Sequence, residues 1–276
     1  MASDCDPSRA VPVLARPRSI QELNALPRES SQPLYLCLIP PPLLAELRID
    51  PGTLCGPSGD RLVQITSPED KPWARVEVRA AADDRDPILL VDVEMSPLAV
   101  PELAFVQVAD PTGPRFGIDR DPDGLDTLYG TRSRNVGEEL RAMHAGLAPG
   151  QVRRGLRMLG SVLQAMERFC ERIGTQIFLI EPLFYHSAIL YERRGCGYLM
   201  GRELMEDLHA AFASGAFAER LDGASPFRPS GAAGTVRGRS WALHDGVSGQ
   251  PWGGVKMYKA TGRNVGGGTT FPGAMY

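Results

Sequence analysis

The sequence predicts an α+β fold in which an antiparallel sheet is followed by alternating helices and strands. Two observations carry this prediction. Four short runs rich in Val, Ile and Leu follow one another between residues 61 and 109, separated by turn-forming clusters. An amphipathic pattern then covers residues 151–173, where apolar residues recur every three or four positions. With 276 residues, the chain is long enough to bury a sizeable core.

The first half of the chain predicts short helices and then the sheet. Ser19 and Glu22 form a capping box that opens a short helix ending at Pro27. Residues 33–39 predict a strand and residues 43–47 a short helix. The four apolar runs are predicted to form an antiparallel meander, with residues 75–79 exposing one solvated face; they are residues 61–66, 73–80, 88–95 and 103–109.

The second half begins with an irregular stretch. Residues 110–150 are rich in Gly and Pro and predict one helix only, at 136–143; irregular insertions of this length are often functional. Gly174 ends the long helix. Beyond residue 221 the chain becomes rich in Gly, Ser and Pro and predicts an extension that ends in an extended arm at 262–276. The remaining predicted elements are strands at 176–180, 198–200, 240–243 and 255–259 and helices at 186–194 and 202–212.

Composition excludes several classes of function. A net charge of −3 gives no general attraction to nucleic acid or to an anionic membrane, and no apolar run reaches the length of a membrane span. The five cysteines form no C-x-x-C pair and the four histidines have no ligand spacing, so we expect no metal. Asp119 opens a D-x-D-x-D-G pattern, but Gly130 stands where a calcium loop needs Glu. The first 17 residues lack a signal-peptide pattern, which predicts a cytoplasmic protein.

The start of the long helix carries the first chemical signal. Arg153, Arg154 and Arg157 lie in its predicted first turns, where the helix dipole disfavours cations. Two interpretations stay open. The arginines form a solvated basic face, or they bind an anion together with free backbone N–H groups beside Gly155.

The second signal lies in the following short helix. Residues 184–195 read FYHSAILYERRG, and Tyr191 and Gly195 fall on the last two positions of the pattern N-x-x-A-x-x-x-Y-x-x-x-G. Ser187 keeps a small residue at the Ala position, whereas Phe184 replaces Asn. With the order of elements around it, this segment makes residues 72–200 resemble the GNAT superfamily of acyl-CoA N-acyltransferases.

The resemblance implies an α/β/α layered fold with a mixed, mainly antiparallel central sheet flanked by helices. It also implies acetyl-CoA or another acyl-CoA as cosubstrate, held at the long helix by Arg153, Arg154, Gly155 and Arg157. A backbone N–H group at Val106 or Val108 would stabilise the tetrahedral intermediate, and Tyr191 would protonate the thiolate. A base would deprotonate the amine acceptor, a small molecule or a protein, and Glu94, Glu181 and His186 are its candidates.

A second hypothesis is a catalytically inactive protein of the same fold with a regulatory or partner-binding role. It is motivated by departures from the family's pyrophosphate pattern Q/R-x-x-G-x-G/A, in which Val152 and Arg157 replace the first and last residues. Three regions are predicted: 1–71 packing on the core, 72–222 as the core with the insertion at 110–150, and 223–276 as an extension. Because such an extension can wrap a neighbouring subunit, we expect a homodimer.

Overall fold

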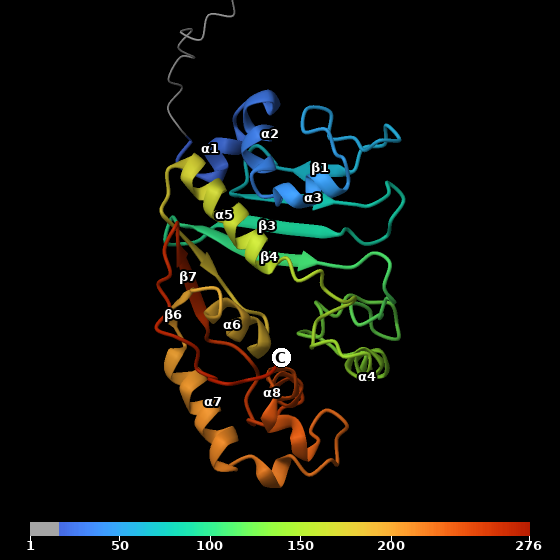
Figure 1. Cartoon of the computed structure of the whole chain (residues 1–276), viewed down its shortest axis with the longest axis vertical. Helices are drawn as coiled ribbons and strands as arrows, with labels where there is room; N and C mark the ends of the chain where they lie inside the picture. Colours follow the sequence, from blue (N-terminus) through green and yellow to red (C-terminus); the bar gives the residue numbers. More distant parts are fainter. Residues whose placement is uncertain (1–16) are drawn as a thin grey trace, which may run out of the picture.

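The fold is built on one seven-stranded sheet, as seen in a computed structural model that describes residues 17–276 (Figure 1). The predicted absence of a signal peptide, and Cys5, concern residues 1–16 and lie outside the described residues. The strand order is β1-β2-β3-β4-β5-β7-β6. The strands are β1 (Val63–Thr66), β2 (Trp73–Val78), β3 (Leu89–Met95), β4 (Pro101–Val108), β5 (Ile177–Ile180), β6 (Gly197–Met200) and β7 (Lys256–Ala260).

Eight α-helices accompany the sheet within the described residues. They are α1 (Ile20–Asn24), α2 (Arg28–Leu36), α3 (Pro41–Glu46), α4 (Val136–His144), α5 (Leu159–Ile173), α6 (Tyr185–Glu192), α7 (Arg202–Ser214) and α8 (Val236–His244). Every strand pair is antiparallel except β4 with β5. The predicted α+β class with a mixed, mainly antiparallel sheet is therefore confirmed.

The predicted meander is present as β1 to β4, and it has two different faces. Ala74, Val76 and Val78 of β2 are buried, whereas Trp73, Arg75 and Glu77 between them are not. The buried face packs against α1, α2 and α5, and Tyr35 of α2 stacks on Phe169 of α5 with ring centroids 5.9 Å apart. Alternation along the strands thus puts apolar side chains under the helices and polar ones on the opposite face.

The N-terminal helices confirm one prediction and overturn another. Ser19 caps α1 as expected, its side chain accepting from the Glu22 N–H at 3.1 Å. Of residues 33–39, predicted as a strand, 33–36 are the last residues of α2, which contains Pro33, and 37–39 form the turn after it. Proline removes one helical hydrogen bond. Helix is nevertheless favoured here because Tyr35 is fully buried against α5 and donates a hydrogen bond to Asn24.

The long helix α5 begins at Leu159, eight residues later than the prediction. The preceding residues use their backbone groups elsewhere. The carbonyls of Val152 and Arg154 accept from Phe116 N–H and Asp110 N–H, each at 2.8 Å, and Arg157 has a left-handed φ of 59°. The predicted helical start is therefore a loop that runs along the end of β4, whereas the C-terminal stop at Gly174 (φ 78°) is confirmed.

The insertion and the C-terminal extension pack together below the sheet (Figure 1). Trp241 of α8 is buried and donates from Nε1 to the carbonyl of Leu147 at 2.9 Å. Residues 240–243, predicted as a strand, are helical in α8, which Thr235 caps by accepting from Gly238 N–H at 2.9 Å and in which residues 239–243 are all buried. The helix predicted at 136–143 is present as α4.

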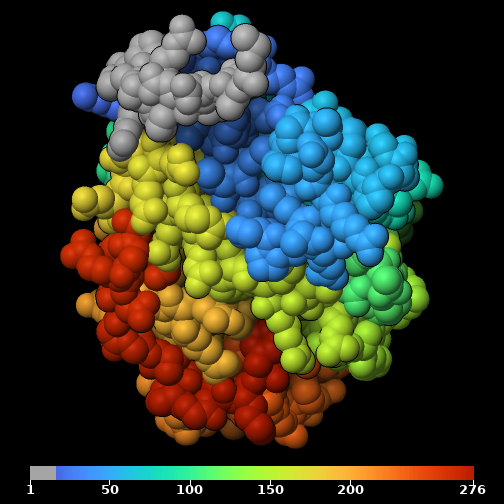
Figure 2. Space-filling view, turned by 45° about the horizontal axis from the view of Figure 1, so that its top comes forward, coloured from blue at the N-terminus to red at the C-terminus, as the bar shows by residue number. Residues whose placement is uncertain are grey.

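The C-terminal extension also completes the sheet. Strand β7 lies between β5 and β6, so the three predicted regions contribute strands to one sheet. Glu192 of α6 accepts hydrogen bonds from Tyr198 and from Thr269 and Thr270 of the last segment. In the space-filling view this segment, in red, lies along the same face as α5, in yellow (Figure 2). None of the helices at 17–276 combines the length and apolarity needed to cross a membrane.

Candidate functional site

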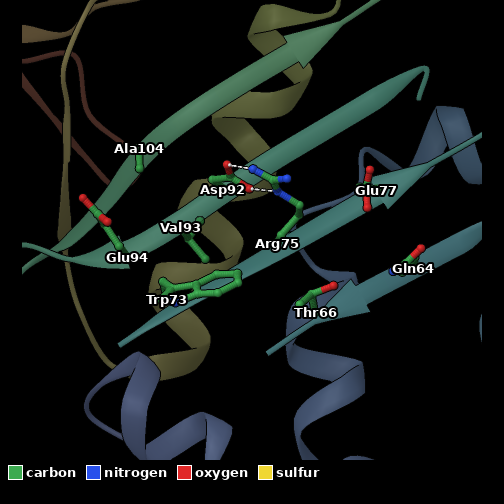
Figure 3. Close-up of a pocket in the computed structure, with 9 residues that line it drawn as sticks. All are labelled: Gln64, Thr66, Trp73, Arg75, Glu77, Asp92, Val93, Glu94 and Ala104. Carbon is green, nitrogen blue, oxygen red and sulfur yellow. Dashed lines mark hydrogen bonds and ion pairs between the residues drawn. The ribbon is translucent and has the colours of Figure 1, made fainter. Parts of the chain in front are cut away.

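A groove of ≈ 520 Å³ lies on the polar face of the β1–β4 meander (Figure 3). Apart from Val93, which belongs to the buried core, its floor is made by the side chains that alternate away from the helices. All four strands contribute to it: Gln64 and Thr66 from β1, Trp73, Arg75 and Glu77 from β2, Asp92, Val93 and Glu94 from β3, and Ala104 from β4. This volume suits a small ligand.

The floor of the groove holds one fixed ion pair. Arg75 and Asp92 are cross-strand partners and form a bidentate pair, with Nε–Oδ1 and Nη2–Oδ2 distances of 2.7 Å (Figure 3). The hydrogen bond to Asp92 raises the pKa of Arg75. Glu77 pairs with Arg79 at 3.2 Å. The carboxylates of Asp92 and Glu77 are therefore each paired with an arginine.

Glu94 differs from these carboxylates. Lys256 of β7 pairs with Glu102 and Glu181, at 2.5 and 3.1 Å, but within residues 17–276 no cationic side chain pairs with Glu94. Partial burial and the negative charges of Glu102, Asp92 and Glu181 raise the pKa of Glu94 and outweigh the nearby charge of Lys256, which lowers it. Of the predicted bases, Glu94 and Glu181 are thus brought together around Lys256.

Strand β4 departs from regular pairing beside this cluster. Asp92 pairs with Phe105 and Val93 with Leu103, so Ala104 is a bulge that faces the groove. Only Glu102 and Leu103 pair with β5, and the two strands then diverge (Figure 1). The bulge and the divergence occur at the same point of β4.

Past the bulge, the edge of β4 that faces β5 is no longer paired with that strand. Ala109 N–H donates to Ile88 O on the β3 side, whereas Asp110 N–H donates to Arg154 O on the opposite side, each at 2.8 Å. Successive residues in a strand direct their N–H groups to alternate sides. Val106 and Val108, predicted as backbone donors, therefore direct their N–H groups toward the side that β5 has left.

The predicted basic segment lies next to this end of β4. A Cβ atom on Gly155 would come within 3.3 Å of the Val108 carbonyl, so the loop approaches the strand closely. Arg153 is engaged by Asp86 at 3.0 Å and by loop carbonyls, and it therefore holds the fold together. Arg154 and Arg157 are exposed. Arg194 adds a guanidinium at the first turn of α5, 3.1 Å from where a Cβ on Gly160 would lie.

The other two predicted catalytic residues lie in α6 and outside the groove. Burial raises the pKa of Tyr191, which packs in the main core beside Cys196. Burial and the nearby charges of Arg237 and His244 lower the pKa of His186 to about 3, and its Nδ1 lies 3.0 Å from Ser240 Oγ. Tyr191 stays a protonated phenol, as a general acid requires, whereas His186 is a buried neutral imidazole.

Sequence reasoning missed most of the groove. It recognised the solvated face of residues 75–79 but not that Trp73, Asp92 and Ala104 share that face. Alternation in β2 and β3 would have placed Trp73, Arg75, Asp92 and Glu94 together once the register was known. The bulge at Ala104 and the position of Lys256, 154 residues away from Glu102, have no local signal.

The described residues contain no group of His, Cys, Asp and Glu side chains that could hold a metal ion. Comparison of the chain with protein-family models, with curated proteins and with solved structures gave no match.

Proposed function

We propose that this protein is an acyl-CoA-dependent N-acyltransferase with a GNAT-like fold, transferring an acetyl or other acyl group to a primary amine. The observation that carries the proposal is that three features follow one another along β4. These are the bulge at Ala104, the divergence of β4 from β5, and the glycine-containing basic loop that leads into α5.

The residues present fit an acyl-CoA in most respects. Arg154, Arg157 and Arg194 are exposed near the N-terminus of α5, where guanidinium groups and backbone N–H groups favour phosphate. Gly155 lets the backbone of the loop approach β4. Val106 and Val108 N–H groups are directed to the side where a thioester carbonyl would need a donor.

In the proposed reaction the amine nitrogen forms a bond to the acyl carbon and the carbon–sulfur bond breaks. The nitrogen loses one proton and the thiolate gains one; an acceptor that arrives as an ammonium first gives a further proton to a base. Glu94 is the base that we favour, because its carboxylate lies beside the bulge and its pKa is raised. Glu181, next to it, is the alternative, and Tyr191 is the proposed proton donor to sulfur.

Calorimetric titration of the full chain with acetyl-CoA tests the proposal. We expect binding at micromolar concentration, weakened about tenfold by Arg154→Ala through loss of a phosphate contact. Arg202→Ala removes another exposed guanidinium, on α7, and serves as the control. Tyr191→Phe is expected to keep this affinity and to lower acyl transfer to an accepting amine about a hundredfold. No binding at millimolar acetyl-CoA would overturn the proposal.

A catalytically inactive protein of the same fold is the second candidate. It is favoured by two specific observations: Arg153 is engaged by Asp86, and Arg157 occupies a left-handed conformation where the family's pattern has a small residue. A failed titration would favour this role. A homodimer and a cytoplasmic location remain predictions under either candidate.

A further inference from the structure

The groove on the polar face of the meander displays a partly exposed aromatic ring. Trp73 begins β2 and leaves 36% of its surface exposed, whereas Trp241 is almost fully buried. In Figure 3 its ring lies between Glu94 and Thr66 on the floor of the groove. Exposed aromatic rings beside carboxylates are favourable contacts for organic cations.

The charges of the groove favour a cation as well. Three carboxylates and one guanidinium line it, and the guanidinium, Arg75, is bound by Asp92. Glu94 faces Trp73 across the β2–β3 pair, and no cation within residues 17–276 pairs with it. Glu102, Asp92 and Glu181 act on Glu94 with their negative charges, and the nearby positive charge of Lys256, which is paired with Glu102 and Glu181, opposes them. A positive group placed against Glu94 would relieve this repulsion.

Away from Trp73, most side chains that line the groove can form hydrogen bonds. Beyond the Arg75–Asp92 pair it continues over Thr66, Gln64 and Glu77. These side chains offer hydroxyl, amide and carboxylate groups to a ligand that lies along the strands. A ligand with an apolar tail would remove water from these polar groups without replacing its hydrogen bonds.

The position of the groove connects it with the proposed reaction. Ala104, the bulged residue of β4, lines the groove and lies where β4 and β5 begin to diverge. A molecule on the groove floor would therefore reach the strand from the polar face, while the basic loop lies at the far end of the same strand.

We propose that this groove is the acceptor site and that it takes a small, polar primary amine in its protonated form. The ammonium lies on the Trp73 ring against Glu94, and hydroxyl or amide groups of the same molecule contact the floor toward Thr66. This inference rests on the proposed acyltransferase function for its biological meaning, but the binding site itself does not require coenzyme A.

The test is calorimetry without coenzyme A, using amines paired with their uncharged counterparts. The pairs are ethanolamine with ethylene glycol, 1,3-diaminopropane with 1,3-propanediol, and glucosamine with glucose. We expect at least one amine to bind about tenfold more tightly than its counterpart. Glu94→Gln and Trp73→Leu should each weaken that binding about tenfold. Glu206→Gln, which changes an exposed carboxylate on α7, should leave it unchanged.

Two results would overturn the proposal: no preference for any amine over its counterpart, or equal affinity in the wild type and both groove variants. Circular dichroism of each variant shows whether it is folded. If a second copy of the chain covers the groove instead, sedimentation will show association that Trp73→Leu weakens, and amines will not bind. The acetyl-CoA titration is independent, so amine binding without acetyl-CoA binding would leave this site in place and remove only the transferase.

Discussion

Two clusters of charged side chains in this molecule are built from similar residues and differ in whether their charges are paired. One is the groove. The other is a buried network below the sheet, formed by Arg134, Glu139, Arg228, His244 and Asp245. Within it Arg134 joins Glu139 and Asp245 at 2.6 and 2.8 Å, Arg228 joins Asp245 at 2.9 Å, and His244 Nε2 lies 3.1 Å from Glu139. In the groove, Glu94 has no such partner among residues 17–276.

The directions of the pKa shifts in the two clusters indicate different roles. Burial tends to raise the pKa values of Glu139 and Asp245, but hydrogen bonds from His244, Arg134 and Ser225 outweigh it and lower both. These bonds join α4 of the insertion to α8 of the extension. The buried network therefore contributes to folding. The pKa of Glu94 moves the opposite way, which is expected for a carboxylate that lacks its cation until a ligand arrives.

The largest effect should follow from breaking the buried network. Glu139→Gln keeps the size of the side chain but leaves Arg134 without one of its two carboxylates. Because Glu139 is only 1% exposed, we expect the free energy of unfolding to fall by about 3 kcal/mol. Urea denaturation followed by circular dichroism measures it.

Glu206→Gln is the control for this change. Its carboxylate forms an exposed pair with Arg202 on α7, and its loss should cost less than about 0.5 kcal/mol. Equal effects of the two substitutions would mean that the buried network contributes no more than a surface pair.

A smaller effect concerns His186, the buried imidazole next to the network. Its folded pKa of about 3 lies below the ordinary 6.5, so between these values the unfolded chain binds a proton that the folded chain does not. Its contribution to stability is intact above pH 6.5 and is lost as the pH falls. Between pH 6.5 and pH 5 we expect the free energy of unfolding to fall by about 1.5 kcal/mol.

His186→Gln should remove this loss, and urea titrations at the two pH values measure it. The window stays above the range in which Glu139 and Asp245 titrate. His144→Gln, at an exposed position of α4, should retain the wild-type pH dependence. A wild-type protein that is equally stable at pH 6.5 and pH 5 would show that His186 is solvated.

Sequence-based prediction succeeded for some elements of the fold and failed for others. Local patterns predicted the four strands of the meander and α4, because alternation and helical periodicity are carried by neighbouring residues. They failed for α2 and α8, where burial of Tyr35 against α5 and of Trp241 against Leu147 decides the structure. These contacts join segments more than 90 residues apart, and no short window contains them.

The site was predicted in part for the same reason. Arg154, Gly155 and a backbone donor at Val106 or Val108 were named through the family resemblance, whereas the directions of these N–H groups follow from the pairing of β4, and the helical start expected at residue 151 is a loop. Glu94 was one of three candidate bases, and local sequence could not choose among them. Its distinguishing feature is that Lys256 pairs with Glu102 and Glu181 instead, which depends on β7 entering the sheet from the end of the chain.

The smallest effect should come from the ion pair inside the groove. Asp92→Asn removes the carboxylate that holds Arg75, a partly exposed pair whose loss should lower the free energy of unfolding by only about 0.5 kcal/mol. The same change frees a cation near the proposed amine position and reduces the negative charge of the groove. We therefore expect amine affinity to fall about twofold, well short of the effect of Glu94→Gln. Calorimetry with the amine that binds most tightly measures the change. A tenfold loss of affinity would mean that Asp92, and not Glu94, is the main contact of the ammonium group. A gain in affinity would mean that the ligand presents an anion to Arg75.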